Sequence, residues 1–268
     1  MATVRKPADP AALVRQNALG VALMGIEAVP AFTRSAAPEV AAAAARKLPP
    51  VEGCPDAVDY PPSPQSKALE AVRQRYLADA PHNAFGYSFT NLVFGEGDPC
   101  AKLMFIGEAP GADEDRTGRP FVGRAGALLN NMIKAMGLRR QDVYIANVLK
   151  VRPPNNATPT HEERAASAPY LFDQIAAIRP QVIVTLGLPA TQVVLGSDQS
   201  MGRLRSIWGE FRHPDTKRHP DVIVPVMPTY HPAYLLRAYT AENRNMVWAD
   251  LKKAMDKLGL KGAATPAQ

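Results

Sequence analysis

The sequence contains only two cysteines, Cys54 and Cys100, and neither belongs to a CxxC pair. Two isolated thiols cannot build a disulfide framework, which argues against a small disulfide-stabilised secreted domain. No apolar run approaches the roughly 18 residues that cross a bilayer. The N-terminus also lacks the basic, apolar and small-residue order of a signal peptide. We therefore expect a cytoplasmic protein without membrane contact.

Nucleotide-binding fingerprints are also missing. The stretch GEAPGADEDRTGRPFVG at 107–123 follows the apolar run KLMFI and precedes a helix-like segment, which is the usual setting of a phosphate loop. It matches neither G-x-x-x-x-G-K-[ST] nor G-x-G-x-x-G. It also carries the carboxylates of Glu108, Asp113, Glu114 and Asp115, which repel a triphosphate unless a metal intervenes. The turn therefore favours a ligand other than a nucleoside triphosphate.

The 268 residues and 46% hydrophobic content allow one large α/β domain with an appendage, or two small domains. Residues 1–65 are rich in alanine and proline, and we interpret them as a partly ordered extension with helical fragments around 10–28 and 38–47. A domain over 66–268 follows, opening on an amphipathic helix at 66–79 that is capped by Ser66 or Ser63.

Short apolar runs alternate with helical patterns over the rest of the chain. Strands are predicted at 102–107, 143–149, 181–187 and 222–228, and helices at 123–137, 160–178, 188–196 and 242–258. This alternation is typical of a parallel sheet that is covered on both faces. Ligands of such sheets bind at the carboxyl ends of the strands. That rule brings together four segments, which are 107–123, 147–154, the region after Gly187, and 229–237.

The net charge of +6 is unevenly distributed. Residues 1–100 hold 9 Lys and Arg against 10 Asp and Glu, whereas residues 101–268 hold 22 against 15. A basic excess of this kind indicates either a polyanionic partner or a solvated basic surface without one. Charge alone leaves both readings open.

Three motifs, GEAPGADEDRTGRPFVGRAG, NVLKVRPPNN and MPTYHPAYLLR, follow one another along the chain. Their order and approximate spacing resemble the uracil-DNA glycosylase superfamily, and most of all its family 4, over about residues 85–258. The resemblance implies a three-layer α/β/α sandwich around a four-stranded parallel sheet. It also implies an enzyme that flips deoxyuridine out of DNA and hydrolyses its N-glycosidic bond, leaving an abasic site.

By position, the resemblance assigns three residues to the uracil base. Phe121 stacks on the flipped base, as a flat apolar ring suits a base face. Asn147 pairs with the Watson–Crick edge, where uracil and cytosine present opposite donor and acceptor patterns. His231 donates a hydrogen bond to uracil O2 and stabilises the departing anion. From the residues alone, a core phenylalanine, an asparagine satisfied by backbone and a turn histidine remain alternatives.

The resemblance is less definite about the water. Glu108 and Ala109 occupy the places where the best-known branch of the superfamily has a glutamine and a catalytic aspartate, and Ala109 cannot activate water. Glu108 is our first candidate for the base and Glu114 the second. The alternative is a mechanism that depends on leaving-group stabilisation and on the anionic DNA, which stabilises an oxocarbenium-like sugar. The backbone of the same turn is expected to approach the DNA or the uracil closely, at Gly107, Ala109, Pro110 and Gly111.

The third motif also implies a contact with DNA. Leu235 and Leu236 are expected to fill the space that the flipped base vacates, with Arg237 on phosphate. The packing of one of the two leucines onto the core is an equally good reading. Further candidate DNA contacts are Arg116 and Arg119, and the cluster of Arg203, Arg205, Arg212, Lys217 and Arg218, which is otherwise simply exposed.

Family 4 enzymes usually hold a [4Fe–4S] cluster through four cysteines. None of the corresponding positions is a cysteine here, so we expect a member without the iron–sulfur cluster and without any other metal or cofactor. We expect packing of the 66–100 segment to replace the structural role of the cluster. The positions that correspond to the four ligands are Ala80, Asn83, Val151, and Ser167 or Ala168.

Two further features bear on mechanism. A related branch forms a covalent adduct with DNA through a histidine in an insertion that this chain lacks, so ordinary turnover is expected. His213 and His219 have no nearby Cys or acidic pair in the sequence and are read as a solvated hairpin loop. The partner implied is uracil-containing DNA, bound by a monomer that is associated with the nucleoid. The alternatives are a lesion- or abasic-site-binding protein with little glycosylase activity, and a small-molecule α/β hydrolase or nucleotide enzyme.

Overall fold

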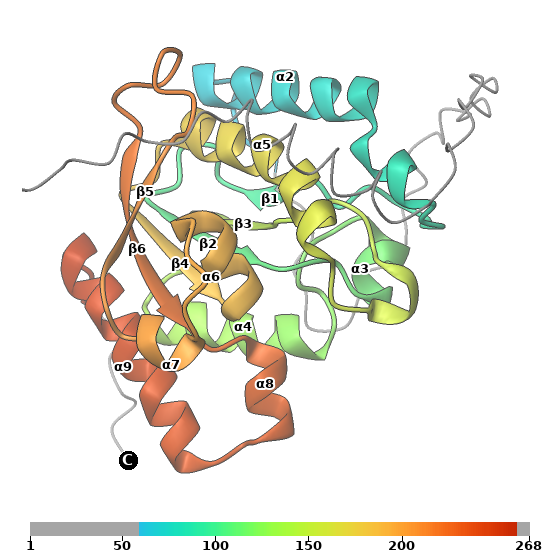
Figure 1. Ribbon diagram of the computed structural model, residues 1–268. Helices are drawn as coiled ribbons and strands as arrows, with labels where there is room; N and C mark the ends of the chain where they lie inside the picture. The colour runs from blue at the N-terminus through green and yellow to red at the C-terminus, as the bar shows by residue number, and fades with distance from the viewer. Residues whose placement is uncertain (1–58, 262–268) are drawn as a thin grey trace, which may run out of the picture. The chain divides into compact units, whose positions relative to one another are not determined.

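Figure 1 shows the computed structural model, which describes residues 59–261. The extension predicted for residues 1–65 lies outside the described residues except for its end at 59–65. The helical fragments predicted at 10–28 and 38–47 lie outside them altogether.

The first described helix, α2 (Pro64–Asp79), begins at a reciprocal cap. The hydroxyl of Ser63 accepts from the backbone N–H of Ser66 at 3.0 Å, and the hydroxyl of Ser66 accepts from the N–H of Ser63 at 2.8 Å. Ser63 is therefore the cap, one of the two residues that the sequence allowed. The helix ends at Ala80 in the left-handed region, and the 3₁₀ turn η1 (Pro81–Phe85) follows.

The sheet has six strands in the order β1-β3-β2-β4-β6-β5. The four predicted strands are confirmed and run parallel at its centre, as β2 (Leu103–Gly107), β3 (Tyr144–Asn147), β4 (Val182–Leu186) and β6 (Ile223–Thr229). The sequence missed the two antiparallel edge strands, β1 (Glu96–Gly97) and β5 (Gly209–Arg212). Both lack an apolar run, since β1 has two residues and β5 buries only Phe211.

Helices cover both faces of this sheet (Figure 1). Alternate residues of the central strands point to opposite sides, so Leu103 and Phe105 join one core cluster while Met104 and Ile106 join the other. The first cluster includes α4 (Arg124–Ala135) and α9 (Ala241–Leu258), and the second includes α5 (His161–Ile178) and α6 (Leu188–Leu195). The three-layer α/β/α architecture predicted from the sequence is confirmed.

Short elements gather where the parallel strands end. Gly107 of β2 is in register with Asn147 of β3, and Leu186 of β4 with Thr229 of β6, so the four strands end at one edge. The remaining elements are α3 (Ala112–Thr117), η2 (Arg140–Asp142), η3 (Pro154–Asn156), α7 (Met201–Leu204) and α8 (Pro232–Arg237). Within residues 59–261, the helices are too short or too polar to cross a membrane.

Candidate active site

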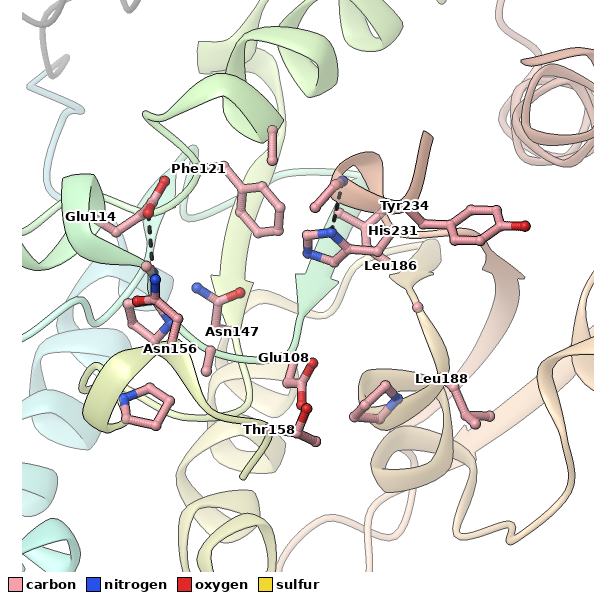
Figure 2. A pocket seen from close by; sticks show the side chains of 18 of the residues that line it. Glu108, Glu114, Phe121, Asn147, Asn156, Thr158, Leu186, Leu188, His231 and Tyr234 are labelled. Carbon is pink, nitrogen blue, oxygen red and sulfur yellow. Dashed lines mark hydrogen bonds between the residues drawn. The ribbon is translucent and has the colours of Figure 1, made fainter. Parts of the chain in front are cut away.

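A cavity of about 770 Å³ opens at this edge of the sheet (Figure 2). Its wall combines the loop after β2, the end of β3, the start of α6 and the segment that leads into α8. The three motifs of the sequence therefore meet around one space, as the strand-end rule predicted. The predicted residues on the wall are Glu108, Ala109, Pro110, Gly111, Glu114, Phe121, Asn147, His231 and Arg237.

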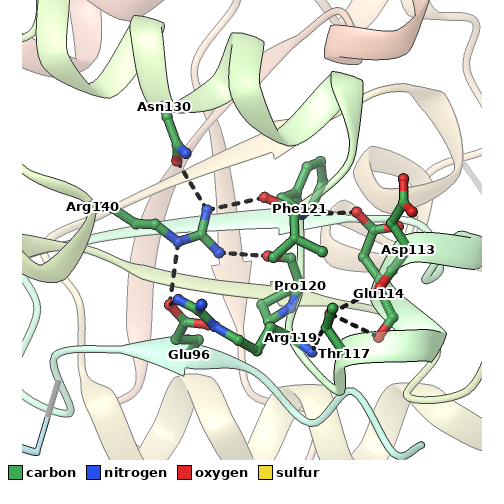
Figure 3. A network of polar contacts seen from close by, with 10 residues as sticks. Glu96, Asp113, Glu114, Thr117, Arg119, Pro120, Phe121, Asn130 and Arg140 are labelled. Atoms are coloured by element: carbon green, nitrogen blue, oxygen red, sulfur yellow. Dashed lines mark hydrogen bonds and ion pairs between the residues drawn. The ribbon is translucent and has the colours of Figure 1, made fainter. Parts of the chain in front are cut away.

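The ring of Phe121 lies against that of His231, with 5.5 Å between centroids and 31° between planes. The backbone of Phe121 has a φ of 51°, which a side chain with a Cβ rarely adopts. The buried guanidinium of Arg140 supports this backbone by donating to the carbonyls of Pro120 and Phe121 (Figure 3). Gly126 leaves room for it, since a Cβ there would lie 1.9 Å from the carbonyl oxygen of Phe121.

The sequence gave no sign of Arg140, which the structure places behind this backbone. Its guanidinium also contacts Glu96 of β1 at 3.2 Å and the side chain of Asn130 at 3.0 Å. Burial raises the pKa of Glu96, but hydrogen bonds and charge from Arg119 and Arg140 outweigh it and hold the pKa below its usual range. Glu96 is thus an anion that neutralises the buried Arg140 and fixes the support of Phe121.

Asn147 stands at the end of β3 and is 1% exposed. Its Oδ1 is buried and has no hydrogen-bond partner among the described residues, so the alternative of an asparagine satisfied by backbone does not account for this atom. A buried amide oxygen without a partner costs about 1–3 kcal/mol. The site is therefore complementary to a ligand that brings an N–H to this atom.

His231 caps α8, because its Nδ1 accepts the backbone N–H of Ala233 at 3.0 Å. This bond leaves the proton of a neutral imidazole on Nε2, which becomes a donor. Burial, with a contribution from the charge of Arg237, lowers the pKa of His231 to about 4. The imidazole is therefore neutral at physiological pH, and the cap at the start of α8 leaves its Nε2–H available as a donor.

Glu108 lies directly after β2, followed along the cavity wall by Ala109 and Pro110. Its Oε1 is buried and has no partner among residues 59–261. Burial raises the pKa of Glu108, and the charge of Arg164 opposes this in part. A carboxyl group with a raised pKa and an unengaged oxygen is suited to receive a proton from a ligand or a water.

Glu114 has a different role in the same cavity wall. Its Oε1 accepts from the backbone N–H groups of Val122 (2.8 Å) and Gly123 (3.0 Å), and its Oε2 accepts from that of Gly111 (3.1 Å). These bonds join the two ends of the turn that holds Phe121. Both carboxylate oxygens of Glu114 are thus engaged by backbone, which makes Glu108 the better candidate for the base.

The rim of the cavity corrects one prediction. Leu235 is 1% exposed and belongs to the core cluster with α4 and α9, so it is not available as a wedge for DNA. Leu236 is half-buried and Arg237 is exposed. Tyr234, which the sequence analysis did not single out, is 38% exposed on the same helix and lines the cavity. The helical period buries every third or fourth residue, and here that residue is the first leucine.

The arginines proposed for DNA contact fall into two groups. Arg116 is exposed, with Asp113 at 3.4 Å, whereas Arg119 donates from Nε to Glu96 Oε2 at 2.7 Å and is engaged in the support of Phe121. In the basic cluster of residues 203–218, Arg205 lies 3.0 Å from the buried Asp250 and thereby fixes α9. Arg116 and Arg237 are the better placed of these cations for a phosphate backbone.

The described residues do not fit an iron–sulfur cluster. A [4Fe–4S] cluster is ordinarily held by four cysteine thiolates, and the single cysteine within 59–261, Cys100, is exposed and lies near Ser63. Cys54 lies outside the described residues. Between α2, η1 and α5 the structure instead has an aromatic group, in which Tyr76 stacks on His82 at 5.5 Å and meets Tyr170 edge-on at 4.9 Å.

The solvated hairpin loop expected around His213 and His219 is confirmed only in part. Residues 214, 216–218 and 220 are exposed between the antiparallel strands β5 and β6, but His213 is not solvated. His213 is 4% exposed, and its Nε2 lies 3.1 Å from Asp173 of α5, with His219 Nε2 at 3.7 Å from the same oxygen. An acidic partner is therefore present, supplied from 40 residues away. The Nδ1 of His213 accepts the N–H of Asp215, which leaves the proton on Nε2, the atom that a metal would need. His213 and Asp173 thus form a hydrogen-bonded pair.

A model of the uracil DNA glycosylase superfamily matches residues 94–252 of the chain. The type-4 uracil-DNA glycosylase of Thermotoga maritima is 46% identical over 166 residues, which cover 62% of this chain and 82% of that protein. The type-4 uracil-DNA glycosylase of Archaeoglobus fulgidus is 44% identical over 173 residues, which cover 64% and 84%. A type-5 uracil-DNA glycosylase of Pyrobaculum aerophilum is 32% identical over 156 residues, covering 52% and 64%.

Proposed function

The chain belongs to the uracil-DNA glycosylase superfamily, and we therefore propose that it extrudes deoxyuridine from DNA and hydrolyses the N-glycosidic bond. The products are free uracil and an abasic site. The observation that carries the proposal is the unpartnered Oδ1 of Asn147, buried in the cavity beside Phe121 and His231.

Asn147 reads the base. Its Oδ1 accepts the N3–H of uracil, and its Nδ2 donates to O4. Cytosine has an acceptor at N3 and a donor at C4, so the same amide orientation leaves both of its groups unpaired. Phe121 supplies the flat face on which the extruded base rests.

His231 stabilises the leaving group. As the glycosidic bond breaks, electrons move onto the uracil ring and charge grows on O2. The Nε2–H of the neutral imidazole donates to this oxygen, and the hydrogen bond strengthens as the charge develops. The lowered pKa of His231 keeps the imidazole neutral, so it stabilises the anion as a hydrogen-bond donor and not as an imidazolium.

Glu108 prepares the water. Its carboxylate accepts a proton from the water that adds to the sugar carbon. It does so in place of the catalytic aspartate of other members, because Ala109 stands at that position and cannot accept a proton. The buried, unengaged Oε1 supports this role. Glu114 serves the reaction indirectly, since its three backbone bonds hold the turn that carries Phe121.

The reaction needs no cofactor in this proposal. The whole sequence holds two cysteines, which cannot supply four thiolates to a cluster. The aromatic group of Tyr76, His82 and Tyr170 packs α2 and η1 against α5 and takes over the structural role. We further propose a monomer that works on DNA at the nucleoid, in the cytoplasm.

The test is uracil release from a duplex and from a single strand that each carry one uracil, read as strand cleavage after alkali. Thymine, hypoxanthine and xanthine in the same position are the controls. We expect cleavage of the uracil strands and none at thymine. A protein that binds uracil-containing and abasic DNA but releases no base would be the lesion-binding alternative, which the alanine at position 109 favours.

A further inference from the structure

Lys150 is fully buried, three residues after Asn147. Its Nζ donates to the backbone carbonyl of Asn147 at 2.7 Å and to Oε1 of Gln174 at 2.5 Å. Gln174 belongs to α5, and its own Nε2 donates to the carbonyl of Phe94 at 2.9 Å. One amino group thus ties the end of β3, directly behind the cavity, to a helix that covers the sheet.

This lysine has no carboxylate partner among residues 59–261. Burying its amino group therefore costs free energy that an apolar side chain would not cost. Burial alone lowers the pKa of Lys150 to about 7. A neutral amine keeps two N–H groups, one for each of its two acceptors, the carbonyl of Asn147 and Oε1 of Gln174. An apolar side chain would pack here at lower cost, so the hydrogen bonds themselves call for an explanation.

The segment that Lys150 holds is also tied to the other half of the site. The N–H of Val148 donates to the carbonyl of Gly107 at 2.9 Å, and that of Leu149 donates to the carbonyl of Glu108 at 3.0 Å. The carbonyl of Lys150 in turn accepts the N–H of Val93 at 2.8 Å. The peptide after Asn147 is therefore the one that Lys150 fixes, and its plane sets the direction of the Asn147 side chain.

We propose that Lys150 is a positioning residue for uracil recognition, which holds the carbonyl of Asn147 and so keeps the Asn147 amide aligned with the edge of the base. The inference rests on the proposed function, since it concerns the same amide. The carbonyl that Lys150 holds belongs to Asn147 itself, so the inference requires that the effect of Lys150 depend on the Asn147 side chain.

The test is a double-mutant cycle of Lys150→Met and Asn147→Ala, measured as kcat and KM for uracil release. Lys150→Met should lower kcat by about 10-fold or more, because a small misalignment of a reacting group has a large effect on rate, while KM changes little. In the Asn147→Ala background the same change should cost less than about 2-fold. An equal loss in both backgrounds, or near-wild-type kcat in the single variant, overturns the inference.

Tyr76→Phe is the matched control, because it removes a buried hydrogen bond, 3.1 Å to His82, on the far side of α5. It should lower stability without changing kcat. If Lys150→Met fails to fold, Gln174→Leu is measured in its place, because it removes one of the two acceptors of the lysine amino group. It should give a smaller loss of kcat, and this loss should disappear in the Asn147→Ala background. If Asn147→Ala alone keeps wild-type activity, the proposed function fails; if only the Lys150 and Gln174 variants keep it, this inference alone fails.

Discussion

Gly107 and Asn147 face each other across β2 and β3 so closely that a Cβ on Gly107 would lie 2.4 Å from Asn147 Oδ1. The same Cβ would lie 2.5 Å from Cζ of Phe121. The absence of a side chain on Gly107 is thus what allows the amide of Asn147 and the ring of Phe121 to lie side by side. β2 is buried along its whole length and ends on this glycine.

Gly107→Ala should therefore displace both base-binding groups. We expect a fall in kcat/KM of about 100-fold or more and a loss of about 1–3 kcal/mol in the free energy of unfolding, from overpacking. Uracil release and denaturant unfolding measure the two effects. Gly202→Ala is the control, because a Cβ there meets nothing within 4 Å; an equal loss of activity in both variants would refute the assignment.

Asn147→Ala and His231→Ala should each lower the rate of uracil release by about 100-fold or more, because each removes a hydrogen bond on which the proposed transition state depends. Single-turnover kinetics on a uracil-containing duplex give the rate of the chemical step. His213→Ala, a buried histidine far from the cavity wall, should leave this rate unchanged for the folded protein. Near-wild-type rates in both site variants would mean that the reaction takes place elsewhere.

The pH dependence should identify the base. In the proposed mechanism Glu108 acts as a carboxylate, and burial raises its pKa above the ordinary 4.5, so kcat should rise with pH through that raised value. His231 titrates lower, at about 4, and adds no step above it. Glu108→Gln should lower kcat and remove the acid limb, while Glu114→Gln should lower stability and keep the limb. An acid limb that survives Glu108→Gln would exclude Glu108 as the base.

Lys150 should also leave a signature in stability. Its pKa is about 7 in the folded protein and 10.5 in the unfolded chain, so between these values the unfolded state binds more protons. The free energy of unfolding then rises with pH in this window, by up to about 1.4 kcal/mol per unit. Urea unfolding of the wild type and of Lys150→Met between pH 7 and pH 10 measures the difference. Parallel curves for the two proteins would contradict the burial of a titrating lysine.

Metal analysis tests the absence of a cluster. Protein purified without oxygen should contain far less than one iron per chain and should lack the visible absorption of an iron–sulfur cluster. Tyr170→Ala should destabilise the packing of α2 on α5, because it removes the ring that meets Tyr76 edge-on. Stoichiometric iron would overturn the proposal and would require ligands other than cysteine.

Sequence patterns of short range determined much of this protein. The alternation of apolar runs and helical periods gave the four parallel strands, since a strand buried on both faces has no polar position to interrupt it. The ends of those strands then placed Phe121, Asn147 and His231 around one cavity, because parallel strands expose their carboxyl ends at the same edge. The sequence also narrowed the cap of α2 to Ser63 or Ser66, since a cap depends on residues three positions apart, and the structure selects Ser63.

The tertiary structure alone decided which side chains are engaged and which are available. Glu108 and Glu114 are six positions apart and chemically alike, yet only the folded turn shows that backbone donors occupy Glu114. Leu235 and Leu236 differ only in which side of a short helix meets the core. The hydrogen bonds of Arg140 to Phe121 and of Lys150 to Gln174 join residues 19 and 24 positions apart. Such pairings depend on how distant elements pack, and no local period of the sequence carries that information.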